Sequence, residues 1–187
     1  MQGGATLQFA MVPLNLMNKN HKADYIVTGN FSGKAAKEAE KYGKVNIAWT
    51  GKDIGFSRIP RQEELKLDPE ADYVHICFNN TIYGSCWDYI PDTGNVPLVA
   101  DMSSCIMSEP IDVSKFALIY AGAQKNVAPA GLTIVIVRED MLGNVNPITP
   151  TMCDYTINAE AKSMHNTPPC WRILSLIHIS EPTTPRL

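Results

Sequence analysis

The amino-acid sequence predicts an α/β fold built on a mostly parallel sheet. Strand-like segments alternate with helical or looped segments along the chain, and several of these strands are apolar throughout. Such strands are typical of a parallel sheet covered on both faces, whereas half-exposed strands alternate apolar and polar residues. The length of 187 residues corresponds to about one domain, or one domain and part of a second.

The individual strands are predicted from short apolar runs, of which the β-branched run 132–137 gives the strongest signal. The full set of expected strands is 23–28, 45–50, 73–78, 97–100, 117–121 and 132–137. Helical spacing predicts a helix over residues 7–17, which Pro13 should end or kink. A second helix is expected over residues 31–42, a loop over 51–70, and a short helical patch over 138–142.

Composition excludes several classes of protein. Sixteen Lys and Arg against nineteen Asp and Glu give a net charge of −3, which argues against a nucleic-acid-binding protein. No apolar run reaches the roughly 18 residues of a membrane span, and because the first residues lack a basic and apolar leader pattern we expect no signal peptide. The five cysteines include no CxxC pair, so we expect reduced thiols, no metal site and a cytoplasmic location.

Two charged residues follow buried strands, where ligands of α/β sheets bind. Asp101 follows the strand 97–100, and Lys125 follows the strand 117–121 shortly afterwards. Taken alone, Asp101 could equally be a helix cap or turn residue, and Lys125 would be read as a solvated loop lysine. Together they suit pyridoxal phosphate, which needs a Schiff-base lysine and an acidic partner for its pyridine nitrogen.

Five segments in the same order resemble the phosphoserine aminotransferase family of class V, fold-type-I pyridoxal phosphate enzymes. The segments are 2–9 (QGGATLQF), 79–84 (NNTIYG), 99–104 (VADMSS), 120–126 (YAGAQKN) and 166–169 (NTPP). The resemblance runs from residue 1 to about residue 172, and family members are about twice as long. It implies a three-layer α/β/α large domain that is incomplete at both ends, without an N-terminal segment and a C-terminal small domain.

The resemblance also implies a role for each matching residue. Lys125 looks like the Schiff-base lysine that later moves the substrate proton, and Asp101 looks like the partner of the pyridinium nitrogen. The remaining cofactor contacts that the resemblance implies are Ala5 and Thr6 at the phosphate, Phe31 stacked on the ring, Thr81 beside its phenolic oxygen, and Gln124 at the phosphate. Taken alone, Gly-Gly-Ala-Thr is a weak signal that any tight turn before a helix could produce.

Asn166 and Thr167 match residues that reach the cofactor phosphate of a neighbouring subunit, which implies a homodimer. Without the resemblance they would be read as a polar turn before two prolines. Two positions depart from the family pattern: Phe31 replaces a frequent tryptophan, and Cys105 replaces a frequent aspartate. His75 lies in an apolar strand and is expected to be a hydrogen-bonded core histidine.

The resemblance implies amino-group transfer between L-glutamate and 3-phosphohydroxypyruvate in serine biosynthesis, and a related reaction in pyridoxine biosynthesis. None of the five arginines, Arg58, Arg61, Arg138, Arg172 and Arg186, falls where the family's substrate-binding arginines are expected. Two alternatives stay open: a catalytically inactive truncated fragment, and another class V enzyme such as a cysteine desulfurase.

The end of the chain does not continue any pattern. The string SLIHISEPT, which begins at Ser175, resembles translated sequencing-adapter read-through. We therefore expect residues 1–172 to form a partial pyridoxal-phosphate-binding large domain and residues 173–187 to be a non-native tail. His178, which lies in that tail, is not expected to be functional.

Overall fold

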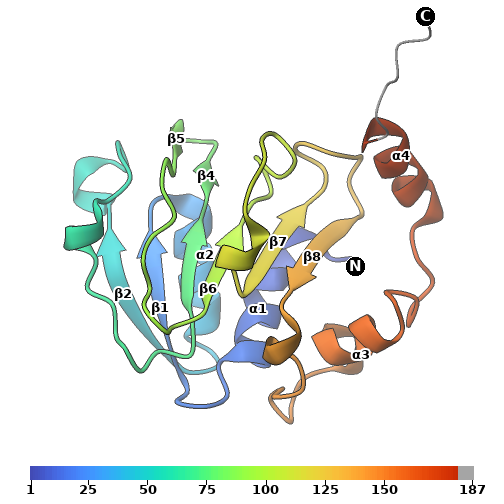
Figure 1. Ribbon diagram of the computed structural model, residues 1–187, viewed down its shortest axis with the longest axis horizontal. Helices are drawn as coiled ribbons and strands as arrows, with labels where there is room; N and C mark the ends of the chain where they lie inside the picture. The colour runs from blue at the N-terminus through green and yellow to red at the C-terminus, as the bar shows by residue number, and fades with distance from the viewer. Residues whose placement is uncertain (181–187) are drawn as a thin grey trace, which may run out of the picture.

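A computed structural model describes residues 1–180 and places six strands in one sheet, in the order β2-β1-β3-β6-β7-β8 (Figure 1). Neighbouring strands run parallel, except that β8 is antiparallel to β7. The α/β class and the mostly parallel sheet are therefore confirmed. The strands are β1 (Lys22–Val27), β2 (Lys44–Thr50), β3 (Val74–Cys77), β6 (Leu98–Asp101), β7 (Leu118–Gly122) and β8 (Thr133–Val137).

A short antiparallel hairpin lies beyond the carboxyl end of β3 (Figure 1). It consists of β4 (Asn79–Asn80) and β5 (Ser85–Cys86), and the sequence did not predict it. Strands of two residues are too short to show a period of two, so no pattern could indicate them.

Two helices, α1 (Gly4–Leu16) and α2 (Asn30–Ala39), cover one face of the sheet. Their apolar residues pack in one cluster with the tyrosines Tyr25 and Tyr120 of the sheet. Helix α1 does not end at Pro13 but continues to Leu16. Proline lacks only its own N–H, and its carbonyl still accepts the Met17 N–H at 3.0 Å, so the last turn is closed. Helix α2 ends at Ala39, earlier than expected, and a turn leads from it to Gly43.

The opposite face is covered by loops, short 3₁₀ turns and part of the C-terminal helix. The expected loop 51–70 contains two such turns, and the expected helical patch 138–142 is a third, Glu139–Met141. Phe78, Trp87 and Phe116 are large aromatic residues buried on this side of the sheet. Within residues 1–180, no helix is both long and apolar enough to cross a membrane.

Two helices near the C-terminus, α3 (Tyr155–Glu160) and α4 (Cys170–Ser180), were not expected from the sequence. Helix α4 crosses the predicted boundary at residue 172 without interruption, and its residues Ile173 and Leu176 pack against the core. Residues 181–187 lie outside the described part of the chain. The division into residues 1–172 and a non-native tail stays a prediction, which the packing of α4 allows us to test.

We predict that Leu176→Ala lowers the free energy of unfolding by about 1 kcal/mol, because Leu176 is half-buried against the core. The matched control is Leu174→Ala, since Leu174 lies in the same helix and its side chain is 57% exposed. Urea unfolding of both variants measures the difference. Equal stabilities for both variants and the parent would instead support a tail without native contacts.

Candidate functional site

The carboxyl ends of the parallel strands β1, β3, β6 and β7 meet at the upper edge of the sheet in Figure 1. Asp101 is the last residue of β6, and Gly122 is the last residue of the neighbouring strand β7. Lys125 follows Gly122 after three residues. The structure therefore brings the predicted acid and the predicted lysine to adjacent strand ends.

Asp101 is buried and held by the residue two positions further on. Its Oδ1 accepts the Ser103 backbone N–H at 2.9 Å and the Ser103 hydroxyl at 2.6 Å. The same Ser103 Oγ accepts the Gly122 N–H at 3.0 Å, so it joins the ends of β6 and β7. Burial raises the pKa of Asp101, while the Ser103 hydrogen bonds and the positive charge of Lys125 oppose that rise.

Phe31 places an aromatic face beside Lys125. The Lys125 Nζ lies 4.4 Å from the centre of the Phe31 ring, within the range of a cation–π contact. The position of Phe31 is set by the start of α2, where the Ser32 Oγ accepts the N–H groups of Thr28 and Gly29. The lysine, the acid and the aromatic ring therefore lie together, although they come from three separate segments.

The hairpin that carries Thr81 packs against the same turn. The Thr28 hydroxyl donates to the Asn80 Oδ1 at 3.0 Å. A Cβ on Gly29 would lie 3.0 Å from that oxygen and 3.1 Å from the Tyr83 ring, so only glycine fits without a shift. Thr81 itself is exposed in the turn between β4 and β5. Its neighbour Asn80 thus fixes the hairpin at the site while Thr81 stays accessible.

The N-terminus of α1 has the properties of an anion-binding site. Gly3 and Gly4 adopt positive φ angles of 90° and 64°, and Ala5 and Thr6 form the first turn after them. No side chain caps this helix end, and its first turn carries no acidic residue. Free N–H groups and the helix dipole together favour a bound anion such as a phosphate.

Backbone pairing places this helix end near the strand ends. Met1 exchanges two hydrogen bonds of 2.8 Å with Thr133 of β8, and Thr133 is the register partner of Gly122. The first residue of α1, Gly4, is therefore three positions from Met1, which is anchored to β8 beside the end of β7. Gln124 is exposed, and its side chain lies against Gly122, where a Cβ would be 2.8 Å from its Oε1.

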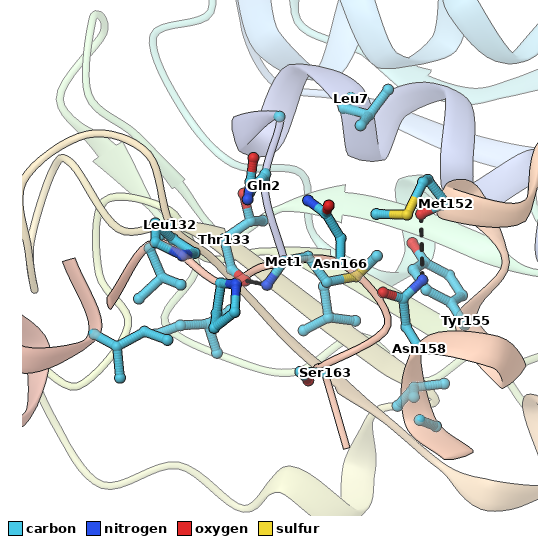
Figure 2. Close-up of a pocket in the computed structure, with 18 of the residues that line it drawn as sticks. Met1, Gln2, Leu7, Leu132, Thr133, Met152, Tyr155, Asn158, Ser163 and Asn166 are labelled. Carbon is cyan, nitrogen blue, oxygen red and sulfur yellow. Dashed lines mark hydrogen bonds between the residues drawn. The ribbon is translucent and has the colours of Figure 1, made fainter. Parts of the chain in front are cut away.

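Asn166 and Thr167 lie elsewhere, beside the edge strand β8. Both are exposed, and the Thr167 carbonyl accepts the Gln2 side-chain amide at 3.1 Å. Figure 2 shows Asn166 near Met1 and Thr133, on the wall of a cavity of about 440 Å³. They therefore lie near the start of α1, and within residues 1–180 neither residue hydrogen-bonds to Asp101 or Lys125.

The cavity itself is lined mainly by apolar side chains from the start of α1, from β8 and from α3 and α4. Figure 2 shows Tyr155, Asn158 and Met152 on its α3 side, where the Asn158 amide donates to the Met152 carbonyl at 3.2 Å. Neither Asp101 nor Lys125 lines this cavity. The apolar cavity therefore borders the start of α1 but does not include the Asp101–Lys125 pair.

The neighbouring thiols are poor nucleophiles. Burial raises the pKa of Cys105 to about 12, and the negative charge of Asp101 contributes to the rise. Burial also raises the pKa of Cys77, the last residue of β3, where Asp101 acts in the same direction. The positive charge of Lys125 opposes the rise in pKa at both Cys77 and Cys105. Asp101 and Lys125 are therefore close enough to act on both thiols.

Sequence reasoning missed the roles of Ser103, which hydrogen-bonds to Asp101 and Gly122, and of Asn80, which hydrogen-bonds to Thr28. Ser103 could have been found, because Asp-x-Ser is a common local motif in which the aspartate accepts hydrogen bonds from the serine two residues on. The same motif occurs at Asp112 and Ser114, with hydrogen bonds of 3.0 and 2.6 Å. Asn80 gives no such local signal, because its partner Thr28 is 52 residues away in the sequence.

The Asp101–Ser103 and Asp112–Ser114 motifs predict opposite changes in stability when the aspartate charge is removed. The pKa of Asp101 is raised in the folded state. The stability that the protonated carboxyl contributes is therefore fully present below the unfolded-state pKa and is lost as the pH rises through the folded-state pKa. The folded-state pKa of Asp112 is lowered, so its contribution is present above the unfolded value and is lost as the pH falls. At pH 7 we therefore expect Asp101→Asn to raise the melting temperature and Asp112→Asn to lower it.

Thermal unfolding without added ligand measures both variants, and the asparagine oxygen can still accept the serine hydrogen bonds. The difference for Asp101→Asn should vanish as the pH falls through the folded-state pKa of Asp101. A lower melting temperature for Asp101→Asn at pH 7 would show that the buried charge is fully compensated in the unliganded protein.

A family model and curated proteins both match nearly the whole of this chain. The family model described as aminotransferase class-V matches residues 1–179. The chloroplastic phosphoserine aminotransferase 1 of Arabidopsis thaliana is 53% identical over 173 residues, which are 92% of this chain and 40% of that protein. The phosphoserine aminotransferase of Lysinibacillus sphaericus is 52% identical over 176 residues, which are 94% of this chain and 49% of that protein.

Solved structures agree with the sequence comparison. The phosphoserine aminotransferase of Bacillus circulans subsp. alkalophilus superposes with a TM-score of 0.92 at 41% identity, covering 96% of this chain and 50% of that one. An aspartate aminotransferase from Thermus thermophilus has the same fold, with a TM-score of 0.80 at 19% identity, over 96% of this chain and 54% of that one. The chain spans about half the length of the curated relatives it matches. It belongs to the aminotransferase class-V family.

Proposed function

We propose that the full-length protein, meaning this chain completed to the length of its relatives, is a pyridoxal-phosphate-dependent phosphoserine aminotransferase. The observation that carries this proposal is the placement of Asp101 and Lys125 at adjacent strand ends, with the face of Phe31 beside the lysine. Relatives at 52–53% identity that are named phosphoserine aminotransferase support the choice of reaction.

The residues present fit pyridoxal phosphate. The group needs an amine for covalent attachment, an anion for its ring nitrogen, a flat apolar contact and a phosphate site. Lys125 and Asp101 provide the first two, Phe31 the third, and the uncapped N-terminus of α1 at Ala5 and Thr6 the fourth. When bound, the cofactor withdraws electrons from the substrate Cα, which makes the Cα–H bond acidic.

The side chains of this chain then have distinct tasks. Asp101, held by Ser103, keeps a proton on the ring nitrogen through its negative charge. Lys125 would bind the cofactor and, once released, would take the proton from the substrate Cα at its Nζ and deliver it to the cofactor C4′. Phe31 covers the ring and excludes water from one side. Thr81 and Gln124 are proposed to contact the cofactor's phenolic oxygen and phosphate, and both are accessible for this purpose.

The substrates are proposed to be L-glutamate and 3-phosphohydroxypyruvate, in serine biosynthesis and in the related step of pyridoxine biosynthesis. Carboxylates and phosphates are usually bound by arginine. Within residues 1–180, two of the arginines are paired with acids, Arg58 with Glu64 and Arg138 with Asp140. The substrate-binding arginines are therefore proposed to come from parts of the full-length protein outside this chain.

A homodimer is proposed because Asn166 and Thr167 lie away from the Asp101–Lys125 pair and are exposed. In a dimer they would reach the cofactor phosphate of the neighbouring subunit. A cytoplasmic location is proposed as well, and the five free cysteines support it, because thiols persist in reducing compartments.

The attachment site gives the first test. Borohydride reduction of the full-length protein with bound pyridoxal phosphate, followed by peptide mapping, should place the label on Lys125. Lys125→Ala should abolish the label, whereas Lys34→Ala should retain it, although the Lys34 Nζ also lies over the Phe31 ring at 5.6 Å. A label on Lys115 or Lys162 would refute the assignment.

The role of Asp101 gives a second test. Asp101→Ala should still allow covalent labelling, but the half-reaction with glutamate should slow by a factor of about 100 or more, because one charge sets the electron demand of the ring. Stopped-flow absorbance measures this rate. Asp112→Ala is the control, since Asp112 forms the same serine motif on the surface. Near-normal turnover of Asp101→Ala would show that the partner of the ring nitrogen lies elsewhere.

A further inference from the structure

The turn that follows Asp101 holds two segments of the site. Residues 102–106 form a single hydrogen-bonded turn. Ser103 lies in this turn, and its hydroxyl donates to the Asp101 carboxylate at 2.6 Å. The next residue, Ser104, accepts the Asn79 side-chain amide on its Oγ at 2.8 Å and donates that hydroxyl to the Asn79 carbonyl at 3.2 Å. Because Asn79 begins the β4–β5 hairpin, the turn fixes the acid and the hairpin together.

The last carbonyl of this turn is bound by a side chain instead of by the backbone. Met107 adopts a positive φ of 63°, so the turn does not continue as a helix. Within residues 1–180, no backbone N–H is hydrogen-bonded to the Ile106 carbonyl. The Asn126 side-chain amide donates to this oxygen at 2.6 Å, across 20 residues of sequence. A third segment of the site, the one that carries Lys125, is therefore tied to the same turn.

Few other contacts hold the segment around the lysine. Its ends are closed by a tight turn, in which the N–H groups of Val127 and Ala128 donate to the Ala123 carbonyl at 3.1 and 2.9 Å. The three residues inside this turn, 124–126, are exposed. In the described part of the chain, the bond from the Asn126 amide is the one hydrogen bond that residues 124–126 make. Without it, the middle of the turn would be free to move relative to the sheet.

The position of the lysine amine depends on this anchor. The Lys125 Nζ lies 4.4 Å from the centre of the Phe31 ring, which is its close contact in the unliganded site. Lysine has a flexible stem, so a shift of its backbone also shifts the amine. A misplacement of about 1 Å at a reacting group can slow a reaction about 100-fold. An anchor on the residue next to Lys125 therefore restricts where the amine can lie.

We propose that Asn126 is a positioning residue for Lys125. Its hydrogen bond to Ile106 ties the turn that carries the lysine to the turn that holds Asp101, so the amine and the acid keep a fixed separation. The consequence for the cofactor rests on the proposed function, whereas the anchoring of the turn does not.

The anchoring is testable without cofactor, by amide hydrogen exchange of the full-length protein. Asn126→Ala removes the donor, and Asn126→Asp keeps the shape of the side chain but leaves only acceptors at pH 7. In both variants the Val127 and Ala128 amides, which close the turn, should exchange about tenfold faster. Asn20→Ala is the matched control, because Asn20 is also exposed and its amide donates to the Glu70 carbonyl at 2.7 Å. Exchange at the parent rate in both Asn126 variants would overturn the proposal.

The consequence for Lys125 is measured by the rate at which pyridoxal phosphate becomes covalently attached to the cofactor-free full-length protein. This rate should fall about tenfold in both Asn126 variants and stay at the parent value in Asn20→Ala, since only the Asn126 variants release the turn that carries the lysine. With cofactor bound, kcat should fall by a similar factor with little change in the KM for glutamate, because substrate contacts are untouched. A purely structural role would lower the melting temperature and leave the attachment rate and kcat unchanged.

The outcomes separate this inference from the proposed function. If both Asn126 variants take up the label on Lys125 at the parent rate and turn over normally, the inference is overturned and the proposed function stands. If the parent protein carries no label on Lys125, the proposed function fails, and hydrogen exchange alone decides whether Asn126 anchors the turn. Slowing of equal size in Asn20→Ala would show a general loss of stability and would also overturn the inference.

Discussion

The arrangement of the site depends on one hydroxyl, the Oγ of Ser103, which donates to the Asp101 carboxylate and accepts from the Gly122 N–H. A buried carboxylate is costly unless it is hydrogen-bonded, and a strand end without a partner leaves unpaired backbone groups. The serine satisfies both requirements at once. It also joins β6 to β7 at the point where they leave the sheet, so the acid and the loop that carries Lys125 keep a constant separation.

The other parts of the site are placed by backbone constraints of the same kind. The Ser32 Oγ accepts the Thr28 and Gly29 N–H groups and so fixes the turn between β1 and α2. Phe31 lies in this turn of the helix, with its ring beside the Lys125 Nζ. Gly29 leaves room for the hairpin beside it, and Met1 pairs with Thr133 to bring the start of α1 to the same end of the sheet. Residues far apart in the sequence therefore meet because each precedes or follows a strand of one parallel sheet.

Much of this could be predicted from the sequence, for a physical reason. The strands are continuous apolar runs, so their carboxyl ends, and with them Asp101 and Lys125, could be located before the structure was known. The β4–β5 hairpin and helix α3 were missed because they are short. Helix α4 was missed because its sequence resembles adapter read-through, although Ile173 and Leu176 lie on one face of it. The hydrogen bond between the buried His75 and Tyr120 was also out of reach, since it depends on the register of strands separated by 45 residues. Asn166 and Thr167 stay predictions, because their proposed role needs a second subunit.

A crystal structure of the full-length protein with pyridoxal phosphate tests the central claim most directly. The account predicts continuous density from the Lys125 Nζ to the cofactor, with the ring against Phe31 and its nitrogen within hydrogen-bonding distance of Asp101. Density that joins the cofactor to another lysine would contradict the account. A ring nitrogen that faces away from Asp101 would contradict it equally.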